Sequence, residues 1–185
     1  MRRIVCLVMV IPFLLVCLPG NGNAAASGLE LEWEHTRAFE DDRDLDTVSV
    51  HILEKISAEK GRSVYRGITI TRPTGTITTM DGTMLESSAT GVGPVYLIRN
   101  EKYRFGKLAA SVDMSGGFIL YDRAFPATGR AYNFMWRLGP QLSYKFNETC
   151  SMNVGYMVMH VSNGLRSHNP GYDAQGVTLG FVSKF

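Results

Sequence analysis

Residues 131–146, AYNFMWRLGPQLSYKF, alternate between large apolar side chains and, with the exception of Met135, polar or small ones. The apolar face consists of Tyr132, Phe134, Trp136, Leu138, Pro140, Leu142, Tyr144 and Phe146. Successive side chains of a strand point to opposite faces, and sixteen positions exceed the length of most strands in soluble proteins. The stretch therefore predicts a strand of a lipid-spanning barrel whose interior is polar.

The order of side chains within the apolar face supports this interpretation. Aromatic residues stand at both ends, and leucine and proline stand between them. In barrels that cross a membrane, amphipathic rings gather at the two headgroup levels and flank the hydrocarbon band. A strand of a soluble β-sandwich is the alternative, and it accounts for this order less well.

The N-terminal segment has the organisation of a secretory signal peptide. Residues 2 and 3 are arginines, residues 4–18 are an apolar run, and residues 24–26 are three small alanines. Fifteen apolar residues are short for a membrane-anchoring helix. We therefore expect residues 1–26 to be cleaved and residues 27–185 to form one domain, the barrel.

The charge and cysteine content of the chain argue against nucleic-acid binding and against an intramolecular disulfide. The chain has 19 basic and 17 acidic residues, and removal of Arg2 and Arg3 with the signal segment leaves 17 of each. A neutral chain offers no electrostatic footprint for nucleic acid. Cys6 and Cys17 leave with the same segment, so Cys150 has no partner for an intramolecular disulfide.

Further segments of varying alternation bring the expected number of strands to eight. Together with residues 131–146, these segments are residues 29–34, 47–52, 62–72, 91–99, 107–121, 149–162 and 177–185. Short turns alternate with longer connections rich in loop residues, at 73–90, 122–130 and 163–173. The fold class is therefore all-β, an eight-stranded antiparallel transmembrane β-barrel. The connection at 54–61 has room for a helical turn.

Eight strands leave space inside for side chains and none for a pore, which makes general transport improbable. We expect the inward charged and amide groups to form a polar plug from Lys107, Asp113, Arg137, Lys145 and Asn153. His35 and His51 have no Cys, Asp or Glu partners at metal-site spacing, so no metal site is expected.

His160 and Ser162 are the candidate catalytic residues. They lie two positions apart near the end of the seventh expected strand, so both side chains are on its apolar, lipid-facing side at headgroup depth. An imidazole takes the proton of a serine hydroxyl while the oxygen attacks an ester. A polar strand end at the headgroups accounts for the same two residues without catalysis.

The stretch His160-Val161-Ser162-Asn163-Gly164, followed by residues 169–173, NPGYD, resembles the motif of the outer-membrane lipid A 3-O-deacylases, the PagL-like or acyloxyacyl-hydrolase-like enzymes. The resemblance implies an eight-stranded esterase that removes the 3-hydroxyacyl chain at position 3 of lipid A. It implies no cofactor, a site facing the outer leaflet of a Gram-negative outer membrane, and lipopolysaccharide as substrate. By position, Ser162 is the nucleophile, His160 the general base, and Asn163 with the Gly164 amide the oxyanion stabiliser.

Two positions depart from the family pattern. The family has Ala before the glycine, which is missing here, and its acidic residue is Glu, where this chain offers Asp173 in a shorter loop. Asp173 either orients His160 as the third catalytic residue or serves only as a turn residue of the loop.

Two other functions remain alternatives. A non-enzymatic structural or adhesive barrel would bind a surface partner through the loops at 73–90 and 122–130. An outer-membrane phospholipase would act on an ester at the same depth, surrounded by the same outer-membrane lipid. The sequence leaves open whether the barrel is a monomer or a homodimer.

Overall fold

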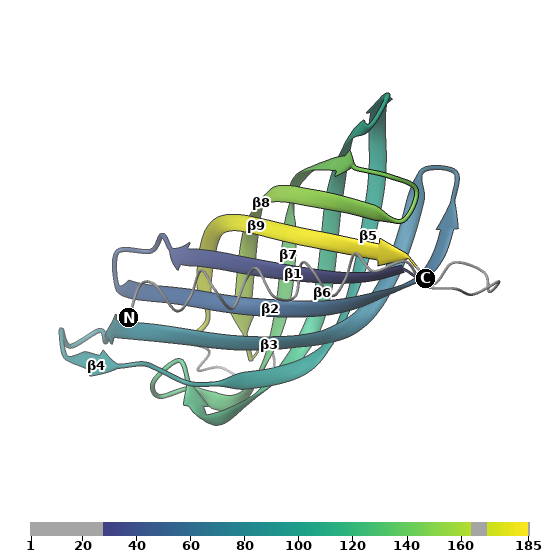
Figure 1. Cartoon of the computed structure of the whole chain (residues 1–185). Helices are drawn as coiled ribbons and strands as arrows, with labels where there is room; N and C mark the ends of the chain where they lie inside the picture. Colours follow the sequence, from purple (N-terminus) through teal and green to yellow (C-terminus); the bar gives the residue numbers. More distant parts are fainter. Residues whose placement is uncertain (1–27, 164–169, 185) are drawn as a thin grey trace, which may run out of the picture.

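A closed antiparallel sheet forms the described part of the chain, residues 28–163 and 170–184 of a computed structural model (Figure 1). The ring contains β1 (Gly28–Ala38), β2 (Arg43–Glu59), β3 (Arg62–Thr78), β5 (Gly91–Phe105), β6 (Leu108–Phe125), β7 (Arg130–Lys145), β8 (Cys150–Ser162) and β9 (Tyr172–Lys184). Pairing of β1 with β9 and of β2 with β3 closes it, so the expected eight-stranded β-barrel is confirmed. The expected signal peptide lies outside the described residues, and these contain no helix able to span a membrane.

The two ends of the ring differ in their connections. At the short-turn end, tight hairpins join β2 to β3, β5 to β6 and β7 to β8. At the long-loop end, four-residue connections follow β1 and β6, and longer segments follow β3 and β8. The segment after β3 contains a short extra strand, β4 (Met84–Glu86), which pairs with β3. Sequence alternation did not indicate β4, because a strand of three residues is too short to show a period.

Alternation along the strands gives the ring an apolar outer surface. On β7 the side chains of Phe134, Trp136 and Leu138 are exposed, whereas Asn133 and Arg137 are buried inside. The same phase continues around the ring, where the exposed apolar residues include Ile52, Ile68, Ile70, Val92, Tyr96, Met114, Leu120, Val154, Tyr156 and Val177. This surface suits the hydrocarbon of a bilayer, as the sequence predicted for β7.

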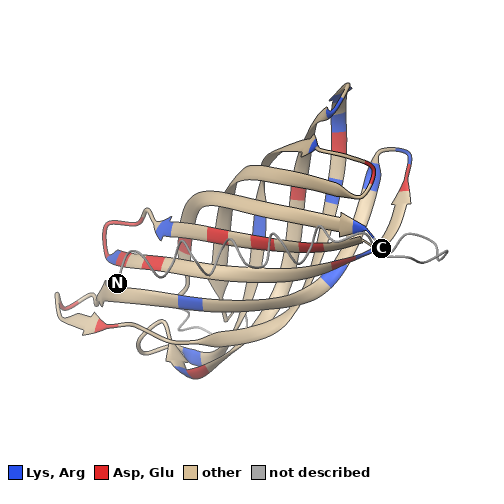
Figure 2. Ribbon diagram, in the orientation of Figure 1, with Lys and Arg blue, Asp and Glu red and all other residues tan. Residues whose placement is uncertain are grey.

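Arg137 organises one layer of the interior. Its Nη1 donates hydrogen bonds to Glu32 Oε1 (2.9 Å) and Glu34 Oε2 (2.7 Å) and lies 2.8 Å from His51 Nε2, and all four side chains are at most 1% exposed. The acidic positions of β1 that supply this layer alternate along the strand (Figure 2). Burial of these charged groups is tolerated because each one has an oppositely charged neighbour and forms hydrogen bonds.

Arg99 organises a second layer nearer the short-turn end. Its guanidinium binds both oxygens of Glu30, at 2.9 and 3.0 Å, and both oxygens of Asp113, at 2.8 to 3.0 Å. Gln141 Oε1 accepts a further hydrogen bond from it, and Asn153 donates to Glu30 Oε1 at 2.6 Å. These layers fill the lumen with side chains, as an eight-stranded ring requires.

The plug differs from the expected one in two members. Asp113, Arg137 and Asn153 are buried in it, but Lys107 is exposed and Lys145 is only partly buried, because both lie beside hairpins at the short-turn end. The helical turn expected at 54–61 is also wrong. β2 runs to Glu59, and residues 60 and 61, with φ of 46° and 80°, make the two-residue turn whose twist matches a hairpin.

Candidate active site

His160 and Asp173 are direct cross-strand neighbours on β8 and β9. The Nδ1 atom of His160 lies 2.7 Å from Asp173 Oδ1, and the two side chains are 33% and 38% exposed. A carboxylate accepts, so Nδ1 carries the donated hydrogen and Nε2 is left as the ring nitrogen that can receive a proton. The geometry gives the imidazole a defined orientation and tautomer.

The position of Asp173 corrects the expectation that it lies in a loop. β9 begins at Tyr172, so Asp173 is the second residue of a strand. Its side chain reaches His160 because the two residues share a register, without any folding back of the preceding loop. The apolar alternation that marks this strand starts only near Val177, since Gln175 and Gly176 interrupt it.

Trp136 supports the opposite side of the imidazole. It is the cross-strand partner of His160 on β7, and the two rings stack with centroids 5.8 Å apart and planes 26° apart. His160 is therefore held between a tryptophan on one neighbouring strand and a carboxylate on the other. Both contacts lie on the outer surface of the ring, in phase with the exposed Val158 and Tyr156.

Ser162 follows His160 on the same face at the last position of β8, and it is only 8% exposed. Phe134 is its partner on β7. Gly171 packs against it from the other side: a Cβ atom on Gly171 would lie 2.9 Å from Ser162 Cβ and 2.7 Å from Val161 O. Glycine at 171 therefore leaves room for the serine.

Of the two residues expected to stabilise an oxyanion, the structure describes only Asn163. Asn163, directly after β8, is 2% exposed and thus packed beside Ser162. Gly164 lies outside the described residues.

A contact network from the β1–β2 connection and the first residue of β2 holds the segment that carries Asp173. Arg43 Nε donates to the carbonyl oxygen of Gly171 at 2.8 Å, and Glu40 Oε2 accepts from the backbone amide of Asp173 at 3.0 Å. Arg43 and Glu40 also approach each other at 3.5 Å. We call Glu40 and Arg43 the clamp. It fixes the backbone on both sides of Tyr172, where β9 begins.

Aromatic side chains cover the outer surface beside Ser162. Phe118 on β6 stacks with Tyr132 at a centroid distance of 6.0 Å and meets Phe134 edge-on at 5.5 Å. Trp136 continues this row along β7. An apolar chain lying on the barrel next to the serine would contact these rings.

Comparison with known proteins identifies the family of this chain. The family model described as lipid A 3-O-deacylase (PagL) matches residues 27–182. The chain belongs to this family. As a lipid A 3-O-deacylase family member it is an ester hydrolase, and its barrel is of the outer-membrane type.

The fold of this family member resembles a crystal structure of the outer membrane enzyme PagL. The TM-score is 0.57 at 14% sequence identity, and the match covers 83% of this chain and 97% of the other. Comparison with curated protein sequences finds no match. The fold is thus retained although most side chains differ.

Two clusters of this deacylase family member, the clamp and the acidic surroundings of His51, were not predicted from its sequence. The clamp was missed because pairing of β1 with β9, which brings residues 40 and 43 to residue 173, is not visible in the order of residues. Sequence spacing gave His51 no acidic partner, but in the fold Glu32 is its cross-strand partner and Glu34 lies next to it. Ligand atoms of these three residues lie within 4.8 Å of one another, and the Arg137 guanidinium supplies positive charge among them.

Proposed function

We propose that this outer-membrane barrel removes the acyl chain esterified at position 3 of lipid A. The main support is the 2.7 Å contact between His160 and Asp173 on the outer surface, where His160 is two residues from Ser162. A hydrolase acting on a lipid ester needs its nucleophile and base at the barrel surface rather than in the lumen. Membership of the lipid A 3-O-deacylase family supports lipopolysaccharide as the substrate.

The proposed reaction begins with attack of Ser162 Oγ on the ester carbonyl while His160 Nε2 takes the hydroxyl proton. Asp173 stabilises the resulting imidazolium through Nδ1. Asn163 and the backbone amide of Gly164 donate to the oxyanion of the tetrahedral intermediate. As the intermediate collapses, His160 returns its proton to the departing sugar oxygen, which leaves an acyl group on Ser162.

Water completes the cycle. His160 takes a proton from a water molecule, the resulting hydroxide attacks the acyl-serine, and the proton returns to Ser162 Oγ as the 3-hydroxy fatty acid leaves. The aromatic row of Phe118, Tyr132 and Phe134 is proposed to hold the acyl chain beside the serine during both steps.

The orientation of the barrel in the membrane follows from the same proposal. We infer that the long-loop end faces the cell exterior and that the site lies at the depth of the outer-leaflet headgroups. The row of aromatic residues at this level of β7 supports that depth. We further propose that residues 1–26 are an export signal, which N-terminal sequencing of the barrel purified from outer membranes would test.

The test uses Ser162→Ala and His160→Ala in cells that express the barrel. We expect release of the 3-hydroxy fatty acid to fall by about 10³-fold or more in each variant. Mass spectrometry of lipid A measures the loss of one acyl chain, and heat-dependent gel mobility checks that the barrel assembles. Near wild-type release by Ser162→Ala would exclude it as nucleophile. Release of fatty acid from glycerophospholipid, with lipid A unchanged, would favour a phospholipase.

A further inference from the structure

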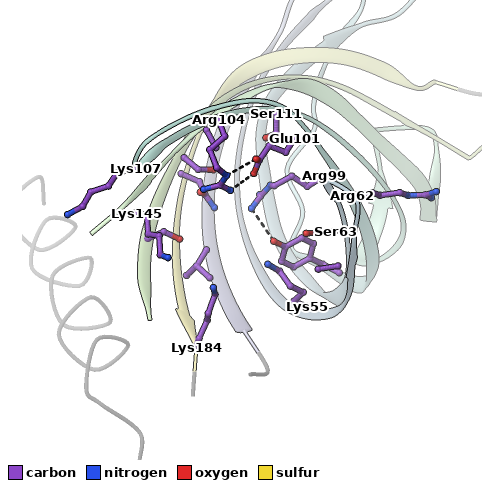
Figure 3. Close-up of a pocket in the computed structure, with 18 of the residues that line it drawn as sticks. Lys55, Arg62, Ser63, Arg99, Glu101, Arg104, Lys107, Ser111, Lys145 and Lys184 are labelled. Atoms are coloured by element: carbon purple, nitrogen blue, oxygen red, sulfur yellow. Dashed lines mark hydrogen bonds and ion pairs between the residues drawn. The ribbon is translucent and has the colours of Figure 1, made fainter. Parts of the chain in front are cut away.

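A polar cavity of about 510 Å³ opens at the short-turn end of the barrel. It is lined by ends of ring strands and their hairpins, whereas His160 and Ser162 belong to the long-loop end (Figure 3). Its lining has eight cationic side chains against three glutamates. The cations are Lys55, Lys60, Arg62, Arg99, Arg104, Lys107, Lys145 and Lys184. The proposed hydrolysis uses none of them.

Lys55 and Lys184 lie together at this cavity. A Cβ atom on Gly28 would lie 3.7 Å from Lys184 Cγ and 3.9 Å from Lys55 Cβ, so both lysine stems flank the same residue. Lys55 Nζ is 5.3 Å from the centroid of the Tyr65 ring, and Arg99 Cζ is 5.2 Å from the same centroid. Three cationic groups therefore gather around one side of the cavity.

Three of the other six cations in the lining have acidic partners. Arg99 binds Glu30 and Asp113, Arg104 binds Glu101, and Lys145 Nζ lies 2.6 Å from Glu148. Lys55 and Lys184 differ: within residues 28–163 and 170–184, no carboxylate oxygen lies within 4.0 Å of either Nζ. Figure 3 also shows Arg62 and Lys107 extending away from the centre.

We propose that this cavity binds a small phosphate-bearing anion between Lys55 and Lys184. Its volume is in the range of small-ligand sites. Phosphate oxygens accept charge-assisted hydrogen bonds from lysine, and the hydroxyl groups of Ser63 and Ser151 provide further donors in the lining. The phosphate group comes either from a soluble anion or from the headgroup of a lipid at this end of the barrel.

Calorimetric titration of the full barrel in micelles of an uncharged detergent, with inorganic pyrophosphate as the probe, tests the proposal. We expect saturable binding, and a Kd at least tenfold higher in the double variant Lys55→Gln/Lys184→Gln. The control Arg37→Gln/Arg123→Gln removes the same charge from exposed positions at the long-loop end, and its Kd should match the wild type. If the double variant does not assemble, the single variant Lys184→Gln replaces it, and its Kd should also rise.

A second titration, with short-chain phosphatidylglycerol in the same micelles, separates the two sources of phosphate. Pyrophosphate binding that depends on the two lysines identifies a soluble anion. Lysine-dependent binding of phosphatidylglycerol alone identifies a headgroup and also supports the site. Binding of neither probe, or equal Kd values for the lysine double variant and the wild type, overturns the proposal.

Discussion

Asp173 and His160 oppose each other across the β8–β9 pair, with Asp173 Oδ1 2.7 Å from His160 Nδ1. The backbone pairing of two ring strands fixes this separation, so neither side chain has to be ordered when a substrate arrives. If His160 is the base, as proposed, its fixed orientation reduces the entropy lost in the transition state. The shorter aspartate suffices because the register brings its Cβ atom next to that of the histidine.

Asp173→Asn should lower kcat while the barrel assembles as before. Asparagine still holds the ring but cannot stabilise the imidazolium, so the loss should be smaller than the one from Ser162→Ala. Steady-state release of the 3-hydroxy fatty acid measures it. Asp122→Asn changes an exposed carboxylate at the same end and serves as the control. Equal kcat for Asp173→Asn and the wild type would remove this carboxylate from the mechanism.

Arg43→Ala should reduce kcat with little change in barrel stability, because it releases the Gly171 carbonyl and weakens the backbone that carries Asp173. The matched control is Arg37→Ala, near the end of β1. Its guanidinium binds Asp44 at 2.9 Å in solvent, where an ion pair contributes about 0–1 kcal/mol. Kinetics and heat-dependent gel mobility of both variants make the comparison. Similar kcat values in the two would show that the clamp does not position the site.

Gly171→Ala should impair the reaction by displacing Ser162. The added Cβ would lie 2.9 Å from Ser162 Cβ and 2.7 Å from a backbone oxygen, so the backbone has to move. Gly116→Ala is the control, because a Cβ there comes no closer than 3.9 Å to another group. We expect a loss of kcat in the first variant alone. Unchanged kcat in Gly171→Ala would show that the serine tolerates the shift.

Arg137→Leu should destabilise the barrel by about 3–5 kcal/mol, since it leaves Glu32 and Glu34 buried without their shared cation. Urea unfolding from detergent or lipid measures the change. Arg66→Leu removes an exposed outer-surface arginine that binds Glu54 and should cost far less. A similar urea midpoint of unfolding for both variants would contradict the proposal that Arg137 stabilises the interior.

The fold could be predicted because the alternation of a ring strand depends on which residues meet lipid, and this is local information. Residues 131–146 carry it almost without exception. Only part of the site could be predicted from the sequence. His160 and Ser162 lie on one strand, so their spacing places them on one face. Residues 40 and 43 meet residues 171 and 173 only through the pairing of the first and last ring strands. His51 and Glu32 likewise meet by register, which composition does not specify.

The glutamates of β1 have a consequence for how the barrel assembles. Glu30 meets its cation on β5, and Glu32 and Glu34 meet theirs on β7. None of these strands adjoins β1 in the ring, so an open sheet holds the acids and the arginines apart. Seam closure and charge neutralisation are therefore a single event. A half-inserted sheet would expose uncompensated charge to hydrocarbon, and this penalty favours insertion only of a ring whose ends have already met.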